Sequence, residues 1–430
     1  MLISLKNNWK KQLPVVLTAT LIIGLVYSRA LLSIASIGFA VVVVTNWQNL
    51  KQYKFLLFGI GLILLPVIIS GFWSEDKIAW YRSVLVKLSL PTVVCGLLAT
   101  QFSFYQIKRL IWLLTIVVTS SALYSCFQFL INKELILKNY LEAKVMPVLM
   151  DDDHIRYSWL LVLNIVLLLW VVFFKTKYDT ESANSHQRIQ IHKKWKLKIE
   201  QLFASLLILF LIAYLHLLAA KTGLVCLYAT IIIAAFYLIV KVKWWKGVLF
   251  IATMCLFVFV SYTNLKSLQN RIKYVVYDFG NYSKGIYTEG SSDGDRVLSL
   301  KAGMSIINQH LIAGVGFGDV QPEVEKWHNL NHPSSKDYER FLPTNQWLIY
   351  GAGSGLLGIA CFSLGLILLL QPMFFKNIFS FVMILILLIP LITDDTFEGQ
   401  FGINIFALVT GLGILLSRER ISRLTVRDSM

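Results

Sequence analysis

Residues 55–72 read FLLFGIGLILLPVIISGF, an apolar run without a charged side chain. About 20 mostly apolar residues are enough to cross a bilayer as a helix. Because the bilayer core offers no water, a crossing backbone must satisfy its own hydrogen bonds, which favours helices. Twelve such runs are found, at 13–27, 30–46, 55–72, 84–100, 110–131, 158–174, 202–220, 222–240, 247–264, 346–370, 377–393 and 403–417. The sequence therefore predicts an all-α integral membrane protein with about twelve transmembrane helices.

The composition supports this class. The chain is 57% hydrophobic and 15% charged, whereas soluble domains have about 45–50% apolar and about 25% charged residues. The first run follows Lys6, Lys10 and Lys11, as in a signal peptide. No small-x-small cleavage site follows it, so we count it as a span. The net charge of +16 is explained by anchoring to anionic lipid rather than by nucleic acid.

Lysine and arginine in short loops set the orientation of a membrane protein. With the N-terminus inside, 22 basic residues face the cytoplasm and about 9 lie in the outer short loops. Both termini are then cytoplasmic, and the long loop 265–345 is extracytoplasmic. The predicted organisation is helices one to six in 1–174, a basic cytoplasmic linker in 175–200, helices seven to nine in 201–264, the extracytoplasmic loop in 265–345, and helices ten to twelve with a cytoplasmic tail in 346–430.

No metal or cofactor site is predicted. The five cysteines all fall within apolar runs, where they act as small hydrophobic residues. Asp151, Asp152 and Asp153 precede His154, but adjacent aspartates more often solvate a loop than bind a metal. No phosphate-binding P-loop, zinc pattern or Ser-His-Asp spacing is present.

The long loop is predicted to contain an amphipathic helix. Val297, Leu300, Met304, Ile307 and Leu311 recur at spacings of three and four, which is the apolar stripe of a helix. Such a helix packs on the outer ends of the spans or lies in the interface beside lipid-linked substrate. The glycine turn that follows, at 314–319, comes after a helix and not a strand, which excludes a dinucleotide-binding fingerprint.

Several cations are predicted on the outer side, where the orientation preference disfavours them: Arg29, Arg82, Arg156, Lys221 and Arg296. Each one alone is explained by snorkelling or by a nearby acid. As a set they favour an anion site, because arginine binds phosphate through a planar fork and lysine through a point charge.

These features resemble the O-antigen ligase and O-antigen polymerase superfamily of bacterial membrane glycosyltransferases. The similarity lies in Asp295-Arg296, then Ala302 and His310-Leu-Ile-Ala-Gly-Val-Gly-Phe-Gly-Asp319, in Asn345-Gln-Trp-Leu348 with Gly355-Leu-Leu-Gly358, and in Lys221-Thr-Gly223. The family writes these as "HPL-GVG-G", "HNQYL…GLLG" and "SR-TG". The motifs cover about 70 residues.

The chain departs from the family at four positions: Leu300 stands where tryptophan is usual, Leu311 where proline is usual, Lys221 where arginine is usual, and Thr344 where histidine is usual. In the ligases that histidine is thought to be the general base. A threonine hydroxyl cannot act as a general base near neutral pH. Candidate substitutes are His332, His328, His310, His154 with Asp153, and Asp395. His332 is favoured because it is borne by the loop and precedes Asn345.

The resemblance implies a GT-C-type fold and metal-independent transfer at the bacterial inner membrane. The donor is an undecaprenyl-pyrophosphate-linked glycan, and the acceptor is a hydroxyl of lipid A core or of another glycan chain. Arg296 and His332 are the expected catalytic residues; Lys221, Arg156, Arg82, Arg29, Asn345 and His154 are expected to bind substrate. The alternative is a polysaccharide or lipid-linked sugar transporter, which usually shows internal repeats; none is visible here.

Overall fold

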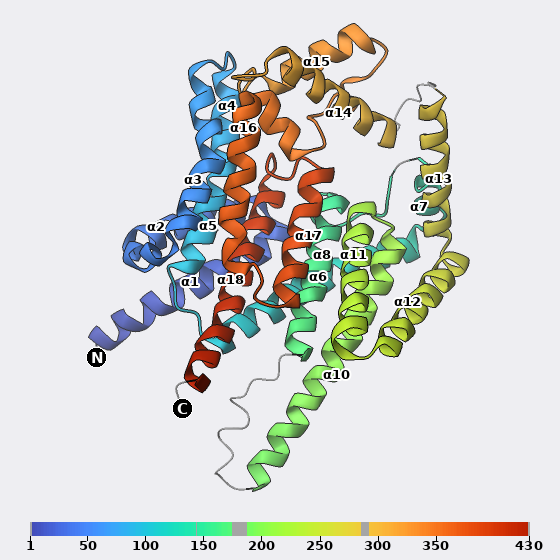
Figure 1. The fold of residues 1–430 in the computed structure, drawn as a ribbon. Coiled ribbons are helices and arrows are strands. Elements are labelled where there is room, and N and C mark those ends of the chain that lie inside the picture. Colours follow the sequence, from blue (N-terminus) through green and yellow to red (C-terminus); the bar gives the residue numbers. More distant parts are fainter. Residues whose placement is uncertain (1, 143, 174–186, 285–291, 429–430) are drawn as a thin grey trace. The chain divides into compact units, whose positions relative to one another are not determined.

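The computed structural model describes residues 2–142, 144–173, 187–284 and 292–428, and these contain helices and no β-strand. The elements are α1 (Leu2–Tyr27), α2 (Arg29–Thr45), η1 (Trp47–Tyr53), α3 (Lys54–Ile69), η2 (Ser70–Phe72), α4 (Lys77–Lys87), α5 (Ser89–Leu98), α6 (Phe104–Ile131), α7 (Lys133–Asn139), α8 (His154–Phe173), α10 (Gln187–Leu218), α11 (Lys221–Tyr237), η3 (Leu238–Val242), α12 (Trp244–Asn264), α13 (Lys266–Ser283), α14 (Ser292–Gln309), α15 (Val320–Asn331), η4 (Asp337–Glu339), α16 (Gln346–Leu370), η5 (Gln371–Met373), α17 (Ile378–Thr393) and α18 (Gln400–Asp428). Figure 1 shows this all-helical fold.

Every apolar run predicted from the sequence lies in a helix, which confirms the all-α membrane class. Nine helices in the described part of the chain are long and apolar enough to cross a membrane. The other three runs form shorter apolar helices, at residues 12–27, 29–45 and 378–393. The count of twelve spans therefore stays a prediction.

The chain divides into two compact units. The first comprises residues 1–102, 137–144 and 269–430, and the second comprises residues 103–136 and 145–268. These units do not test the five consecutive segments predicted from the sequence, so that organisation stays a prediction. Residues 187–200 of the predicted basic linker form the start of α10, and the rest of that linker lies outside the described residues.

In the first unit, α3 and α16 pack along each other, as do α5 and α18 (Figure 1). Two glycines allow the close approach of α3 and α16. A Cβ added at Gly59 would lie 2.7 Å from the carbonyl oxygen of Gly365, and one added at Gly365 would lie 2.7 Å from that of Gly59. N-terminal and C-terminal segments are thus interleaved in one core.

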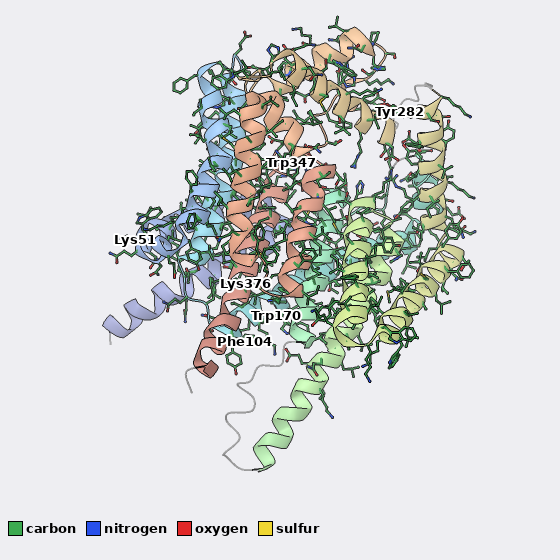
Figure 2. All side chains as sticks on the ribbon, viewed as in Figure 1. Lys51, Phe104, Trp170, Tyr282, Trp347 and Lys376 are labelled. Atoms are coloured by element: carbon green, nitrogen blue, oxygen red, sulfur yellow. The ribbon has the colours of Figure 1, made fainter. Side chains whose placement is uncertain are left out.

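In the second unit, α8 packs against α6, α10 and α11. Phe104 at the start of α6 and Trp170 on α8 lie with their ring centroids 5.4 Å apart (Figure 2). Glu200 joins α10 to α6, since it accepts hydrogen bonds from Lys108 at 2.6 Å and from Trp112 at 2.9 Å. This unit also holds an apolar cavity of about 370 Å³ lined by residues of α6, α10 and α12 together with Leu265.

The segment predicted as the long loop contains three α-helices, α13, α14 and α15, where the sequence predicted one. A small apolar cluster holds α14 and α15 on α16: Ala302, Ile306, Ile307, Val320, Val324 and Ala352 are all buried in it. The segment is therefore packed on the end of a candidate span.

The predicted helix is present as α14, but the predicted apolar stripe was wrong. Met304 is 50% exposed and Leu311 is 47% exposed. The buried face instead runs through Leu298, Ala302 and Ile306, with Ser299 and Gly303 beside them. Small residues decide this face, because Gly303 lies against Pro343 and leaves no room for a larger side chain.

Candidate active site

The glycine turn is joined to a break in α16. Val315 N–H donates to the carbonyl of Ala352 at 2.8 Å, and Gly316 N–H donates to that of Gly353 at 3.0 Å. The helix can break there because Gly355 adopts φ +64°, and Leu356 N–H donates to the carbonyl of Leu311. Peptide groups freed by the break are thus satisfied by the turn.

The same turn is joined to the end of α3 and the start of α4. Asp319 accepts hydrogen bonds from Glu75 N–H at 2.7 Å and from Asp76 N–H at 2.9 Å. Ser74 Oγ accepts from Gly318 N–H at 3.1 Å. A Cβ at Gly318 would lie against the carbonyl of Asp76, so this glycine is needed for the close approach.

Arg296 and Asn345 meet at the C-terminal end of α17. Arg296 Nη1 donates to the carbonyl of Thr393 at 3.4 Å, and Asn345 Nδ2 donates to that of Ile392 at 3.0 Å. Asn345 also caps α16, because its Oδ1 accepts from Leu348 N–H at 3.1 Å. The structure therefore brings two of the predicted site residues together at the end of α17, directly before the connection to α18 (residues 394–399).

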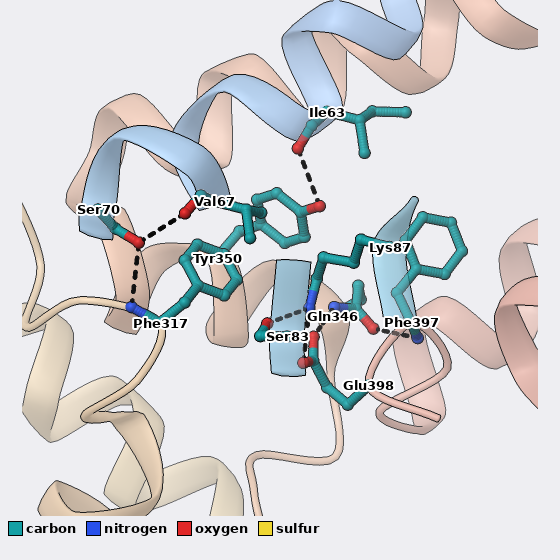
Figure 3. A network of polar contacts seen from close by, with 10 residues as sticks. All are labelled: Ile63, Val67, Ser70, Ser83, Lys87, Phe317, Gln346, Tyr350, Phe397 and Glu398. Carbon is teal, nitrogen blue, oxygen red and sulfur yellow. Dashed lines mark hydrogen bonds and ion pairs between the residues drawn. The ribbon is translucent and has the colours of Figure 1, made fainter. Parts of the chain in front are cut away.

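A fully buried lysine, Lys87, contacts that connection through Glu398 (Figure 3). Lys87 Nζ donates to Glu398 Oε2 at 2.7 Å and to Ser83 Oγ at 2.8 Å, and lies 5.1 Å from the centre of the Phe317 ring. Lys87 lies within the apolar run 84–100, and the sequence assigned it no role.

Gln346 completes this network. Its Nε2 donates to Glu398 Oε1 at 2.9 Å, and its Oε1 accepts from Phe397 N–H at 2.8 Å (Figure 3). The amide therefore joins the start of α16 to the connection that follows the end of α17.

Thr344, at the position of the family histidine, is buried against α14. Its N–H donates to Ser299 Oγ at 3.2 Å, and the two hydroxyl oxygens lie 3.3 Å apart. Ser299 is fully buried. The hydroxyl pair fixes the segment before Asn345 to the helix that bears Arg296.

A group of ionisable residues surrounds the start of α14. Asp295 is 5% exposed, and burial together with the charges of Glu339 and Asp278 raises its pKa from 3.8 to about 7. Arg271 on α13 is 6% exposed and stacks over Tyr274 at 5.3 Å. Its Nε and Nη1 are buried without a hydrogen-bond partner in the described structure. Burial lowers the Arg271 pKa, Asp293 raises it, and the charge of Arg296 lowers it.

The loop histidines lie on α15 and at its end. His332 packs on Trp327, with ring centroids 5.6 Å apart, and burial and the charge of Lys301 lower its pKa. His328 is fully buried, with Nδ1 3.2 Å from Ser335 Oγ. Burial and the charges of His332 and Arg340 lower the His328 pKa. His310, at the end of α14, is exposed.

The remaining predicted cations of the first unit have separate surroundings. Arg29 lies 5.1 Å from the centre of the Phe401 ring at the start of α18. Arg82 is exposed on α4. Arg29 therefore borders the same connection as Arg296 and Lys87.

Arg156, Lys221 and His154 belong to the second unit. Arg156 pairs with Asp153 at 2.7 Å, and His154 begins α8. Lys221 begins α11, whose Gly223 N–H donates to Ser158 Oγ on α8 at 3.1 Å. Gly223 thus sets how closely these two helices pack within their unit.

Residues 203–363 match the family model described as O-antigen ligase. This match covers a little more than a third of the chain and supports the O-antigen ligase and polymerase superfamily that the motifs resemble. The matched domain suggests an enzyme of the ligase or polymerase glycosyltransferase kind. The matched segment includes Lys221, Arg296, His332 and Asn345. No curated protein matches the chain.

Sequence reasoning missed Arg271, Lys87 and the chemistry of Asp295. Arg271 belongs to a helix that the sequence did not predict. Lys87 depends on Glu398, which lies 311 positions later. Asp295 was named only as part of the Asp295-Arg296 motif; its acidic neighbours Asp278 and Glu339 come from two other elements.

Proposed function

We propose that this protein transfers a glycan from a polyprenyl-pyrophosphate carrier to an acceptor hydroxyl on lipid A core or another glycan chain. The reaction takes place at the outer face of the bacterial inner membrane. The proposal depends on one observation. Arg296 and Asn345, which both belong to the matched O-antigen ligase segment, contact the end of α17.

The chemistry requires stabilisation of a leaving group. The acceptor oxygen attacks the anomeric carbon while the bond from that carbon to the diphosphate oxygen breaks. The electron pair leaves with the diphosphate, whose developing charge must be neutralised. A guanidinium does this through two parallel N–H donors, so we propose a metal-independent reaction.

Arg296 is the first candidate for this contact, and Arg271 supports it. The positive charge of Arg296 lowers the pKa of Arg271. The two guanidinium groups therefore repel each other in the absence of an anion. Two donor nitrogens of Arg271 are unpaired, although buried donors are normally satisfied. A diphosphate oxygen near both guanidinium groups would remove both costs.

The other predicted residues keep their proposed roles. Arg29, Arg82, Arg156 and Lys221 are proposed to bind the donor, and His154 to bind substrate. Asn345 is proposed to position the acceptor by holding α16 against α17. His332 stays a prediction for the proton acceptor.

In vitro transfer with the purified protein and a purified lipid-linked glycan tests the function. We expect Arg296→Ala to lower kcat/KM by about 100-fold or more, as removal of a charge-stabilising donor does. Lys326→Ala is the control, because this lysine is 67% exposed in the same segment. Uptake of lipid-linked sugar into vesicles without any transfer would support a transporter and contradict the proposal.

The proposed orientation has its own test. Single cysteines in place of Lys326 and Lys376 in a cysteine-free chain should react with an impermeant reagent from opposite sides. Labelling of position 326 from the cytoplasmic side would contradict the proposed side of catalysis.

A further inference from the structure

Asp295 lies at the start of α14, directly before Arg296. Its side chain is 5% exposed, and no hydrogen-bond partner is found for it among the described residues. A buried carboxylate without a donor is costly. Such a group is retained at a site more often than in a core that only needs to be stable.

The charges around Asp295 oppose its ionisation. Asp278 of α13 and Glu339 of η4 face it with negative charge. Together with burial they raise the Asp295 pKa to about 7. The cationic groups nearby are Arg271 and Arg296, which interact with each other. The other titratable groups that act on Arg271 are Tyr274, Asp293 and Tyr140. Asp295 can therefore release and accept a proton near neutral pH.

Helix geometry relates Asp295 to Thr344. Residues four apart lie on the same helix face, so Asp295 is one turn before Ser299. Ser299 Oγ contacts both the N–H and the hydroxyl of Thr344. Asp295 is thus one helical turn from Ser299, the residue that contacts the position where related ligases carry a histidine.

The buried donors of Arg271, unpaired in the described structure, are an independent observation that indicates a ligand site near the start of α14. Arg271 is 6% exposed, and its Nε and Nη1 have no partner within the described residues. It interacts with Asp293 and Arg296, the residues on both sides of Gly294 and Asp295. A buried guanidinium with free donors suits a phosphate oxygen, and an anionic ligand bound to it would lie near the start of α14.

We propose that the Asp295 carboxylate is the general base that accepts the proton of the acceptor hydroxyl, in place of the histidine that Thr344 replaces. This inference rests on the proposed glycan transfer. As the new bond forms between the acceptor oxygen and the anomeric carbon, the O–H bond breaks and its proton passes to an oxygen of Asp295. The electron pair of the broken glycosidic bond leaves with the diphosphate.

His332 is a weaker choice by its contacts. Its ring packs on Trp327 and His328, Lys301 lowers its pKa, and its carbonyl accepts from Ser335; none of these residues belongs to the segment of Thr344 and Asn345. Asp295 is connected to that segment through one turn of α14 and one hydroxyl pair.

The test compares the pH dependence of transfer in the wild type, Asp295→Asn and His332→Ala. We expect wild-type kcat/KM to rise about tenfold per pH unit up to about pH 7 and then to level off. Asp295→Asn should lower kcat by about 100-fold or more, lose this rise and keep its KM for the donor. Asp337→Asn is the control, because that side chain is fully exposed.

A second variant separates chemistry from folding. Adding Thr344→His to Asp295→Asn should recover at least about tenfold in kcat, since it restores the base of related ligases at a neighbouring position. Thermal unfolding should show that Asp295→Asn is folded.

The outcomes are distinct. If Asp295→Asn keeps both its kcat and the rise with pH, Asp295 is not the base. If His332→Ala alone loses that rise, the base is His332, and this inference is likewise overturned. If the wild type transfers no glycan from any lipid-linked donor, the proposed function itself fails.

Discussion

The polar groups around Lys87 and those around Asp295 lie in the same unit, but only the first set is satisfied. Lys87 has two oxygen acceptors and an aromatic ring, and Glu398 accepts from two donors. Asp295 has no hydrogen-bond donor in the described part of the chain, and two nitrogens of Arg271 are unpaired. Buried polar groups that serve stability are normally paired. The difference separates a structural network from a site that is completed by its ligand.

The largest expected effect comes from breaking the satisfied network. Lys87→Met leaves Glu398 without its cation, and removal of one partner of a buried ion pair costs about 3–5 kcal/mol. The midpoint of thermal unfolding in detergent should fall accordingly. Arg82→Met on the same helix is the control, since Arg82 is exposed and surface changes are usually within about 0.5 kcal/mol. A loss below about 1 kcal/mol for Lys87→Met would remove the contrast between the two clusters.

A change of pH is expected to have an intermediate effect on the free energy of unfolding. The pKa of Asp295 is raised from 3.8 to about 7, so the folded protein keeps a proton that the unfolded chain has released. Between about pH 4 and pH 7, stability therefore falls as pH rises, by something on the order of 2 kcal/mol. Asp295→Asn should flatten this slope and make the protein more stable than the wild type at pH 8. An unchanged slope would show that Asp295 is ionised without cost.

The smallest effect on stability is expected at Arg271. Arg271→Met removes unpaired buried donors, so we expect a gain of about 1 kcal/mol in the free energy of unfolding. The KM for the lipid-linked donor should rise about tenfold, because a phosphate contact is lost. Unfolding and donor titration of the same preparation measure both quantities. A clear loss of stability would mean that Arg271 has a structural partner and is not kept for a ligand.

The sequence predicted the helices of the apolar runs well, because such runs determine helices in lipid without reference to distant residues. It predicted the wrong face of α14, because the apolar stripe gave no weight to the close packing that Ser299 and Gly303 allow. The family motifs identified Arg296 and Asn345, and the structure shows how both reach α17.

The rest of the site depends on contacts that no local pattern shows. The Lys87–Glu398 pair joins residues 311 positions apart. The surroundings of Asp295 are assembled from α13, α14 and η4. A single sequence contains the residues of such clusters but not the information that they meet.

The Lys87–Glu398 pair also has a consequence for biogenesis. Lys87 lies within the candidate span Lys77–Leu98, and an uncompensated charge in a bilayer is unfavourable. Its counter-ion is synthesised only near the end of translation, so α4 reaches its final state after almost the whole polypeptide has left the ribosome. We therefore expect a chain truncated before Glu398 to carry Lys87 as an uncompensated charge within this span.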